Sequence, residues 1–174
     1  MPVFAKTKLT IEDTCMPPRA IVELSYSGPD PDKIYPKVLD ILRAKLAVPE
    51  HLIQEKEYEW DRSKLPEKFS MSIEAIKEFD RFSYMLLKIK IKGSVKPSKE
   101  LGKEGEAKVE IEGVVRTEYP QDSLWERSIL YELLRTIYHK TVYQQRFLRF
   151  KEECRKAMLA LQDELKSFFE ILPR

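Results

Sequence analysis

The sequence is poor in the residues that build most catalytic and metal sites. It has two histidines, two cysteines, five glycines and no asparagine among 174 residues. So few glycines argue against a glycine-rich loop that cradles a phosphate group. His51 and His139 lack cysteine, histidine or carboxylate partners at metal-ligand spacing. We therefore expect no cofactor and no metal.

The two cysteines, Cys15 and Cys154, are too few for a disulfide framework. The N-terminus lacks the charged-then-apolar layout of a signal peptide, so the simplest expectation is a cytoplasmic protein with reduced thiols. The absence of asparagine beside abundant lysine and glutamate is typical of thermophilic proteins and predicts a thermophilic source.

Long apolar runs and a charge excess are also missing. No apolar stretch approaches the ~18–20 residues of a membrane span. The 31 Lys+Arg residues nearly balance 29 Asp+Glu residues, and this net charge of +2 gives no global electrostatic case for binding nucleic acid. A chain of this length is about one domain, so we expect residues 1–174 to form a single domain with a proper core.

Alternating apolar and polar residues predict an antiparallel sheet. The expected elements are strands at 3–14, 19–27 and 52–60, a helix at 31–47 capped by Asp30 or Asp32, and a three-stranded meander at 69–118. Odd positions of the meander should face inward, and Lys88, Lys90 and Lys92 should face water. A tight hairpin at 79–82 and a loop at 96–105 would connect its strands, and Gly113 would mark a bulge.

The C-terminal segment is expected to be helical. A capping box at Ser123–Glu126 opens it, and residues 124–172 contain neither glycine nor proline. One continuous helix of that length would measure ~70 Å, which exceeds a globule whose radius of gyration is ~16 Å. The helix must therefore break near 139–145 or project, and residues 146–172 would form a projecting or folded-back extension.

Together these elements predict an α+β fold in which a curved antiparallel sheet of five or six strands packs on a long C-terminal helix. The order of the elements at 19–27, 33–47, 69–118 and from 124 onward resembles the START-like, helix-grip superfamily. That family has more strands and a terminal helix nearer half this length, and the helix at 146–172 has no counterpart in it. The resemblance implies a cavity between sheet and helix that holds an apolar ligand.

The first functional hypothesis is a non-catalytic binding protein for a lipid-like or other hydrophobic small molecule. The cavity would be lined by apolar residues of the meander and the C-terminal helix: Phe69, Met71, Ile73, Met85, Leu87, Ile89, Val109, Ile111, Leu130, Leu134 and Ile137. Lys56, Tyr58 and Trp60, on one face of the strand at 52–60, would orient the ligand's polar head. Two alternatives stay open: the same apolar residues form a solid core, and the strand at 52–60 is a protected edge.

The second hypothesis is a protein-interaction or oligomerisation module. The C-terminal helix carries a heptad-like apolar stripe, which comprises Cys154, Met158, Leu161, Leu165, Phe168 and Leu172. A stripe of this size must be buried. Its partner could be a second copy, another protein, or the domain itself.

The third hypothesis is a metal-dependent phosphate or nucleotide hydrolase that uses Glu55, Glu57 and Glu59, which alternate along one strand as in triphosphate tunnel enzymes. The alternative is a solvated ion ladder. Basic and aromatic residues are also interleaved at 138–156, but Glu152 and Glu153 interrupt the charge, and this pattern favours a packed amphipathic helix over a nucleic-acid contact.

Overall fold

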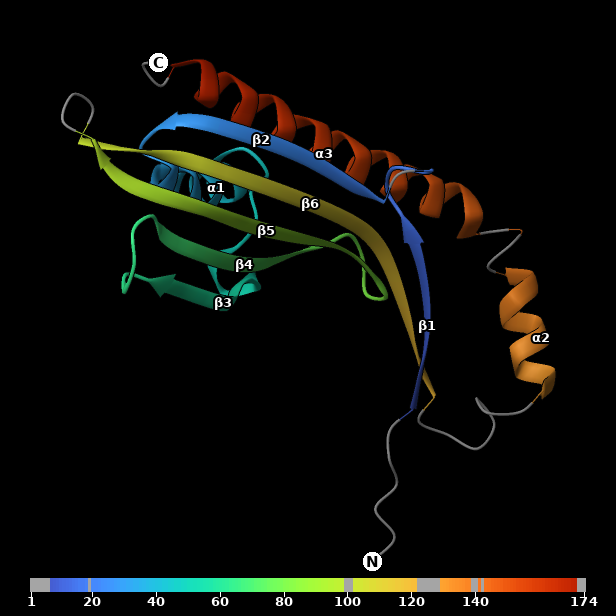
Figure 1. Cartoon of the computed structure of the whole chain (residues 1–174). Coiled ribbons are helices and arrows are strands. Elements are labelled where there is room, and N and C mark those ends of the chain that lie inside the picture. The colour runs from blue at the N-terminus through green and yellow to red at the C-terminus, as the bar shows by residue number, and fades with distance from the viewer. Residues whose placement is uncertain are drawn as a thin grey trace, which may run out of the picture.

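The computed structural model describes residues 7–18, 20–98, 102–121, 129–138, 141 and 143–171. Its fold is α+β: a six-stranded antiparallel sheet with a long C-terminal helix lying along it (Figure 1). The predicted fold class is therefore confirmed. No helix among the described residues combines the length and apolar character needed to cross a membrane.

The element boundaries lie close to those predicted. The strands are β1 (Thr7–Thr14), β2 (Ile21–Pro29), β3 (Ile53–Asp61), β4 (Glu67–Glu78), β5 (Ser83–Ser98) and β6 (Gly102–Gln121). The helices are α1 (Ile34–Ala44), α2 (Ile129–Tyr138) and α3 (Gln144–Ile171), with short 3-10 turns at Pro31–Lys33 and Glu50–Leu52.

Strand β6 is the axis of the sheet. The sheet runs in the order β1-β6-β5-β4-β3, and β2 also pairs with β6. The outer edge of β6 pairs with β2 over residues 104–112 and with β1 over residues 114–121, so β1 and β2 lie end to end along one strand. The opposite edge of the sheet is β3, which among the described strands pairs with β4 alone.

The two faces of the sheet differ as the alternation predicts. Odd-numbered residues of the meander are buried, among them Ile73, Ile89 and Ile111, which have no exposed surface and lie directly opposite one another. They form one continuous core with α1 and α3. Lys88, Lys90 and Lys92 project from the other face, which we call the open face because no helix packs on it in Figure 1.

Two expectations about the β5–β6 hairpin are wrong. Residues 96–98 and 102–105 of the expected loop are strand, because β5 continues to Ser98 and pairs with the start of β6. Gly113 is not a bulge, because it lies opposite Leu87 in unbroken register. A Cβ at Gly113 would collide with Met158 and crowd Cys154, so this glycine lets α3 approach the sheet closely.

The predicted cap of the first helix is also wrong. Asp30 makes no side-chain capping hydrogen bond; its carboxylate instead accepts a hydrogen bond from Lys33 Nζ at 2.7 Å. Asp32 accepts one from Lys103 Nζ at 2.7 Å. α1 packs through one apolar stripe, since Ile34, Val38, Ile41 and Leu42 are buried.

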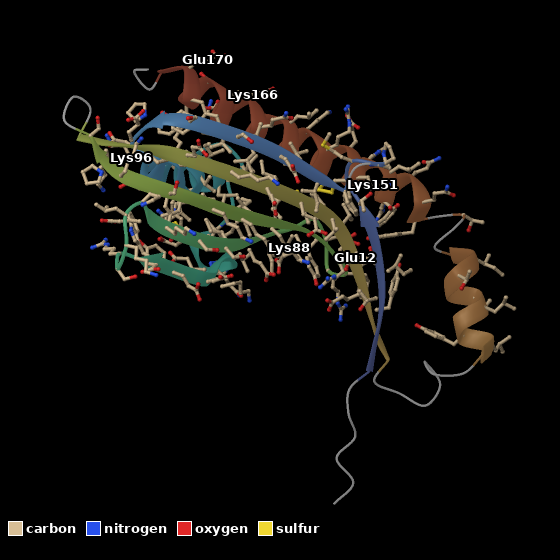
Figure 2. All side chains as sticks on the ribbon, viewed as in Figure 1. Glu12, Lys88, Lys96, Lys151, Lys166 and Glu170 are labelled. Carbon is tan, nitrogen blue, oxygen red and sulfur yellow. A yellow bond between two sulfur atoms is a disulfide. The ribbon has the colours of Figure 1, made fainter. Side chains whose placement is uncertain are left out.

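The expected reduced thiols are replaced by a disulfide between Cys15 and Cys154, whose Cα atoms lie 5.6 Å apart (Figure 2). The bond joins the β1–β2 connection to α3 across 139 residues of sequence. Both cysteines are buried, at 2% and 0% exposure. Two cysteines far apart in sequence carry no pairing signal, and the fold alone brings them together.

Candidate interaction site

The long C-terminal helical segment is interrupted near the expected position. α2 ends at Tyr138 and α3 begins at Gln144, and Figure 1 shows α2 beyond the end of α3 and apart from the sheet. α3 lies along the sheet, where it packs on β6, β2 and α1. The two halves of the segment therefore differ in environment.

The stripe of α3 is covered by the protein itself. Cys154, Met158, Leu161 and Leu165 are at most 1% exposed and belong to the core, and Phe168 packs against it. Leu172 lies outside the described side chains. The sequence left open whether this stripe packs on a second copy, on another protein or on the domain itself. In the structure it packs on the domain's own sheet and on α1.

The residues expected to line an apolar cavity fall into two separate groups. The eight from the strands pack in the core at 4% exposure or less. Leu130, Leu134 and Ile137 lie on α2, where they are 56%, 54% and 51% exposed. The structure therefore does not bring the two groups together as one wall, and the hypothesis of a ligand between sheet and helix stays a prediction.

The polar residues of β3 do not share one face either. The register of β3 against β4 shifts between Glu55 and Glu57, which leaves Lys56 unpaired in a bulge. Lys56 reaches Gln54 at 2.7 Å and Glu74 at 3.3 Å, and both of these face the open side. The predicted common face of Lys56 with Tyr58 and Trp60 is therefore wrong.

Tyr58 and Trp60 lie on the core side of this edge strand. Tyr58 is 54% exposed and contacts Tyr35 edge-on, with ring centroids 5.8 Å apart. Trp60 donates a hydrogen bond from Nε1 to Glu67 at 2.8 Å and packs on Phe69. Arg62 and Lys103 both lie over its ring. These contacts hold the edge strand against the core.

The bulge also divides the glutamate row. Glu55 lies opposite the buried Ile73, on the core side, where burial of the Tyr35 phenol and the hydrogen bond that it donates to Glu55 raise the pKa of Tyr35. Glu57 and Glu59 lie opposite Ser72 and Ser70, on the open face. Three carboxylates that do not share a face do not form the row that the hydrolase hypothesis requires. Among the described residues, no group of three or more His, Cys, Asp or Glu side chains is placed to hold a metal ion.

The remaining predicted sites are structural where they can be described. His51 is exposed in the Glu50–Leu52 turn, and His139 lies outside the described residues. In the basic and aromatic segment, Tyr143 and Phe147 are buried, and Phe150 stacks on Phe79 with centroids 4.7 Å apart. This burial is expected for a packed amphipathic helix, which is the structure that the sequence favours for this segment.

Among the described residues, large apolar side chains that are exposed to water gather on one face of α2. Leu133 joins the three predicted residues at 56% exposure. The four occupy positions i, i+3, i+4 and i+7, so they form one continuous aliphatic face. We call this set, Leu130, Leu133, Leu134 and Ile137, the α2 face. The same spacing in the sequence could have identified Leu133.

A groove of mixed polar and apolar lining lies at the start of β2. It has a volume of about 430 Å3 and is lined by Met16, Ile21, Val22, Glu23 and Gln162. The side chain of Ile21, which lines this groove, is 47% exposed. We call this set the β2 groove; it lies between the free edge of β2 and α3, which run alongside each other in Figure 1.

Comparisons with known proteins give no functional lead. No protein-family model and no curated protein matches the chain. A solved structure of a Staphylococcus aureus protein of unknown function is similar at 11% sequence identity, with a TM-score of 0.23 over 92% of this chain and 98% of that one. A likeness at this level says nothing about what the chain does.

Proposed function

We propose that the protein is a non-catalytic self-association module, in which the α2 face of one copy lies in the β2 groove of a second copy. The observation that carries the proposal is the aliphatic face of α2, in which every side chain is more than half exposed. Four anchors at i, i+3, i+4 and i+7 are the pattern by which amphipathic helices bind apolar grooves.

The cost of leaving this face in water is substantial. Full burial of a leucine or isoleucine side chain contributes ~1.5–3 kcal/mol, so covering the remaining half of four such side chains contributes roughly 3–6 kcal/mol. Within the described part of the chain, α2 does not pack on another helix or strand to the extent that α3 packs on β6 and α1. An occupant from outside the described fold is therefore favoured.

In a pair of identical copies, each copy carries both an α2 face and a β2 groove. Association costs about 4–15 kcal/mol in lost translational and rotational freedom, which one α2 contact barely offsets. A two-fold arrangement makes the contact twice, because each copy contributes one helix and one groove. It also covers Ile21, the exposed isoleucine in the groove, together with the α2 face.

The area available argues against pairing of α2 with α2. A helix of 10 residues is ~15 Å long, whereas helices that pair alone in water are several heptads long. An interface made only of two such faces would be well below the ~800 Å2 per partner of stable complexes. Reciprocal docking adds the surface of two grooves.

Sedimentation velocity on three single variants tests this arrangement. We expect the native chain to dimerise at concentrations on the order of 100 µM. Leu134→Lys, on the α2 face, and Ile21→Lys, in the β2 groove, should each give monomers. Leu148→Lys is the matched control, because Leu148 is 54% exposed on α3 and belongs to neither surface; this variant should dimerise normally.

Mixing the two monomeric variants tests directly whether the α2 face of one copy binds the groove of another. A mixed pair retains one intact contact, between the native α2 of the Ile21→Lys chain and the native groove of the Leu134→Lys chain. Because one contact barely offsets the cost of association, we expect a mixed dimer that forms only at higher concentration than the native dimer, and no dimer in either variant alone. A monomeric native chain, or a dimer that Leu134→Lys abolishes and Ile21→Lys leaves intact, would refute reciprocal docking; the second result would mean that α2 pairs with α2.

A further inference from the structure

A depression on the open face shares no lining residue with the association surfaces. It has a volume of about 390 Å3 and crosses β2, β6, β5 and β4. Lysine and serine side chains dominate its polar lining, namely Lys68, Lys92, Lys108, Ser25, Ser27 and Ser94, and Glu106 is the one carboxylate in it. Neighbouring strands place these residues side by side, since Lys108 lies opposite both Lys92 and Ser25, and Lys68 lies opposite Ser94.

The pairing of β5 with β6 changes its charge pattern at this depression. Lys88, Lys90 and Lys96 of β5 each lie opposite a glutamate of β6. Lys92 instead lies directly opposite Lys108. Like charges directly opposite each other destabilise a sheet, so this pair costs free energy in the unliganded protein.

The two lysines of this pair have different surroundings. Lys108 Nζ contacts Glu23 at 3.1 Å and Glu110 at 3.2 Å, and these hydrogen bonds raise its pKa. Lys92 makes no ion pair within the part of the chain that the structure describes. Lys68 faces Asp61 across the β3–β4 pair. The positive charge at Lys92 is thus the least compensated in the depression.

We propose that this depression binds a single phosphate-type oxyanion, either free or as the phosphate group of a small phosphomonoester. Lys92 and Lys68 would supply charge, and the hydroxyls of Ser25 and Ser94 would donate hydrogen bonds to the phosphate oxygens. An anion beside Lys92 also relieves its repulsion with Lys108. Glu106 at one end repels further negative charge, which favours one phosphate group over a polyphosphate.

Backbone amide shifts recorded by NMR during a titration test the site. Sodium phosphate and, in a separate arm, phenyl phosphate are added to the full chain while sodium chloride holds the ionic strength constant. We expect saturable shifts at residues of the depression, with a Kd in the millimolar range. Saturation by both probes indicates recognition of the phosphate group itself; saturation by only one identifies which source the site accepts.

Two variants of neighbouring lysines separate a site from general surface charge. Lys92→Gln should weaken phosphate binding at least ~10-fold, as expected for loss of a charge-assisted hydrogen bond. Lys90→Gln is the matched control, because Lys90 projects from the same strand face but lies opposite Glu110 and outside this depression. It should change binding less than about twofold.

Stability in the absence of phosphate gives a second measurement. Lys92→Gln should raise the thermal midpoint in chloride buffer, because it removes the unfavourable pair with Lys108. Non-saturable shifts with both probes, or an equal loss of binding in Lys90→Gln, would overturn the proposal. The depression shares no lining residue with the α2 face or the β2 groove, and neither Lys92 nor Lys90 lines either of them, so these two variants test the phosphate site apart from self-association; the link between the two surfaces is the ion pair of Lys108 with Glu23.

Discussion

At the scale of single residues, one buried hydroxyl network ties the start of α3 to the sheet. The Tyr143 hydroxyl donates a hydrogen bond to Asp80 Oδ2 at 2.7 Å and lies 2.6 Å from Ser83 Oγ. Ser83 in turn lies 2.7 Å from Thr117 Oγ1. Ser83 and Thr117 are at most 1% exposed and Tyr143 is 4% exposed. The network thus joins the β4–β5 hairpin, β6 and the C-terminal segment.

This network predicts a loss of stability at alkaline pH. Burial raises the pKa of Tyr143, and the Asp80 carboxylate raises it further, although the hydrogen bond with Ser83 opposes this. The folded protein therefore keeps a proton that the unfolded chain releases above pH ~10. Stability is complete below that pH and falls as the pH rises above it, by up to ~1.4 kcal/mol per pH unit for one such group.

Urea unfolding between pH 9 and 11 measures this slope. Tyr143→Phe should flatten the slope and should also cost about 1–3 kcal/mol at neutral pH, because Asp80 and Ser83 lose a buried partner. Tyr58→Phe is the control, since this phenol is 54% exposed, and it should change neither quantity. An unchanged slope in Tyr143→Phe would contradict the assignment.

At the scale of elements, sequence alternation predicted the strands of the meander and their buried faces. It succeeded there because each strand has one dry and one wet face, so parity alone determines which side chains are buried. It failed at β3, since a single extra residue, Lys56, reverses the faces without any signature in the sequence. It also failed at 96–105, where Pro97, Gly102 and Gly105 are typical of a loop. Gly105 instead meets the Ser94 backbone so closely that no side chain fits.

The disulfide is the element-scale link that the sequence did not predict. It fixes α3 to the β1–β2 connection, beside the Cys15 amide that donates a hydrogen bond to the Gly113 carbonyl at 3.0 Å. Cross-links that close long loops stabilise by restricting the unfolded chain, typically by ~2–4 kcal/mol. We expect a Cys15→Ala/Cys154→Ala double variant to lose stability in this range.

Thiol counting and unfolding together check this prediction. The native chain, denatured without reductant, should show no free thiol, and after reduction it should show two. Reduced native protein should lose about as much stability as the double variant, because both lack the same cross-link. Two free thiols before reduction would show that the bond does not form.

At the scale of the whole molecule, the two C-terminal helices have opposite roles. α3 completes the core, with Cys154, Met158, Leu161 and Leu165 buried against the sheet and α1. α2 presents apolar side chains of similar size to the outside. Composition and periodicity could not separate these roles, because both stripes have the same helical spacing, and only the path of the chain decides which one meets the sheet.

This difference predicts contrasting effects of altering the two helices. Removal of residues 144–174 strips α3 from the core, and loss of its large buried side chains alone costs roughly 6–10 kcal/mol. Since domains are stable by only about 5–15 kcal/mol, the truncated chain should lose cooperative unfolding and near-UV circular dichroism. A Leu130→Glu/Leu134→Glu chain should keep the native urea midpoint at concentrations where the protein is monomeric, because these side chains contribute little to its own core. Cooperative unfolding of the truncated chain would mean that the sheet and α1 form a sufficient core without α3.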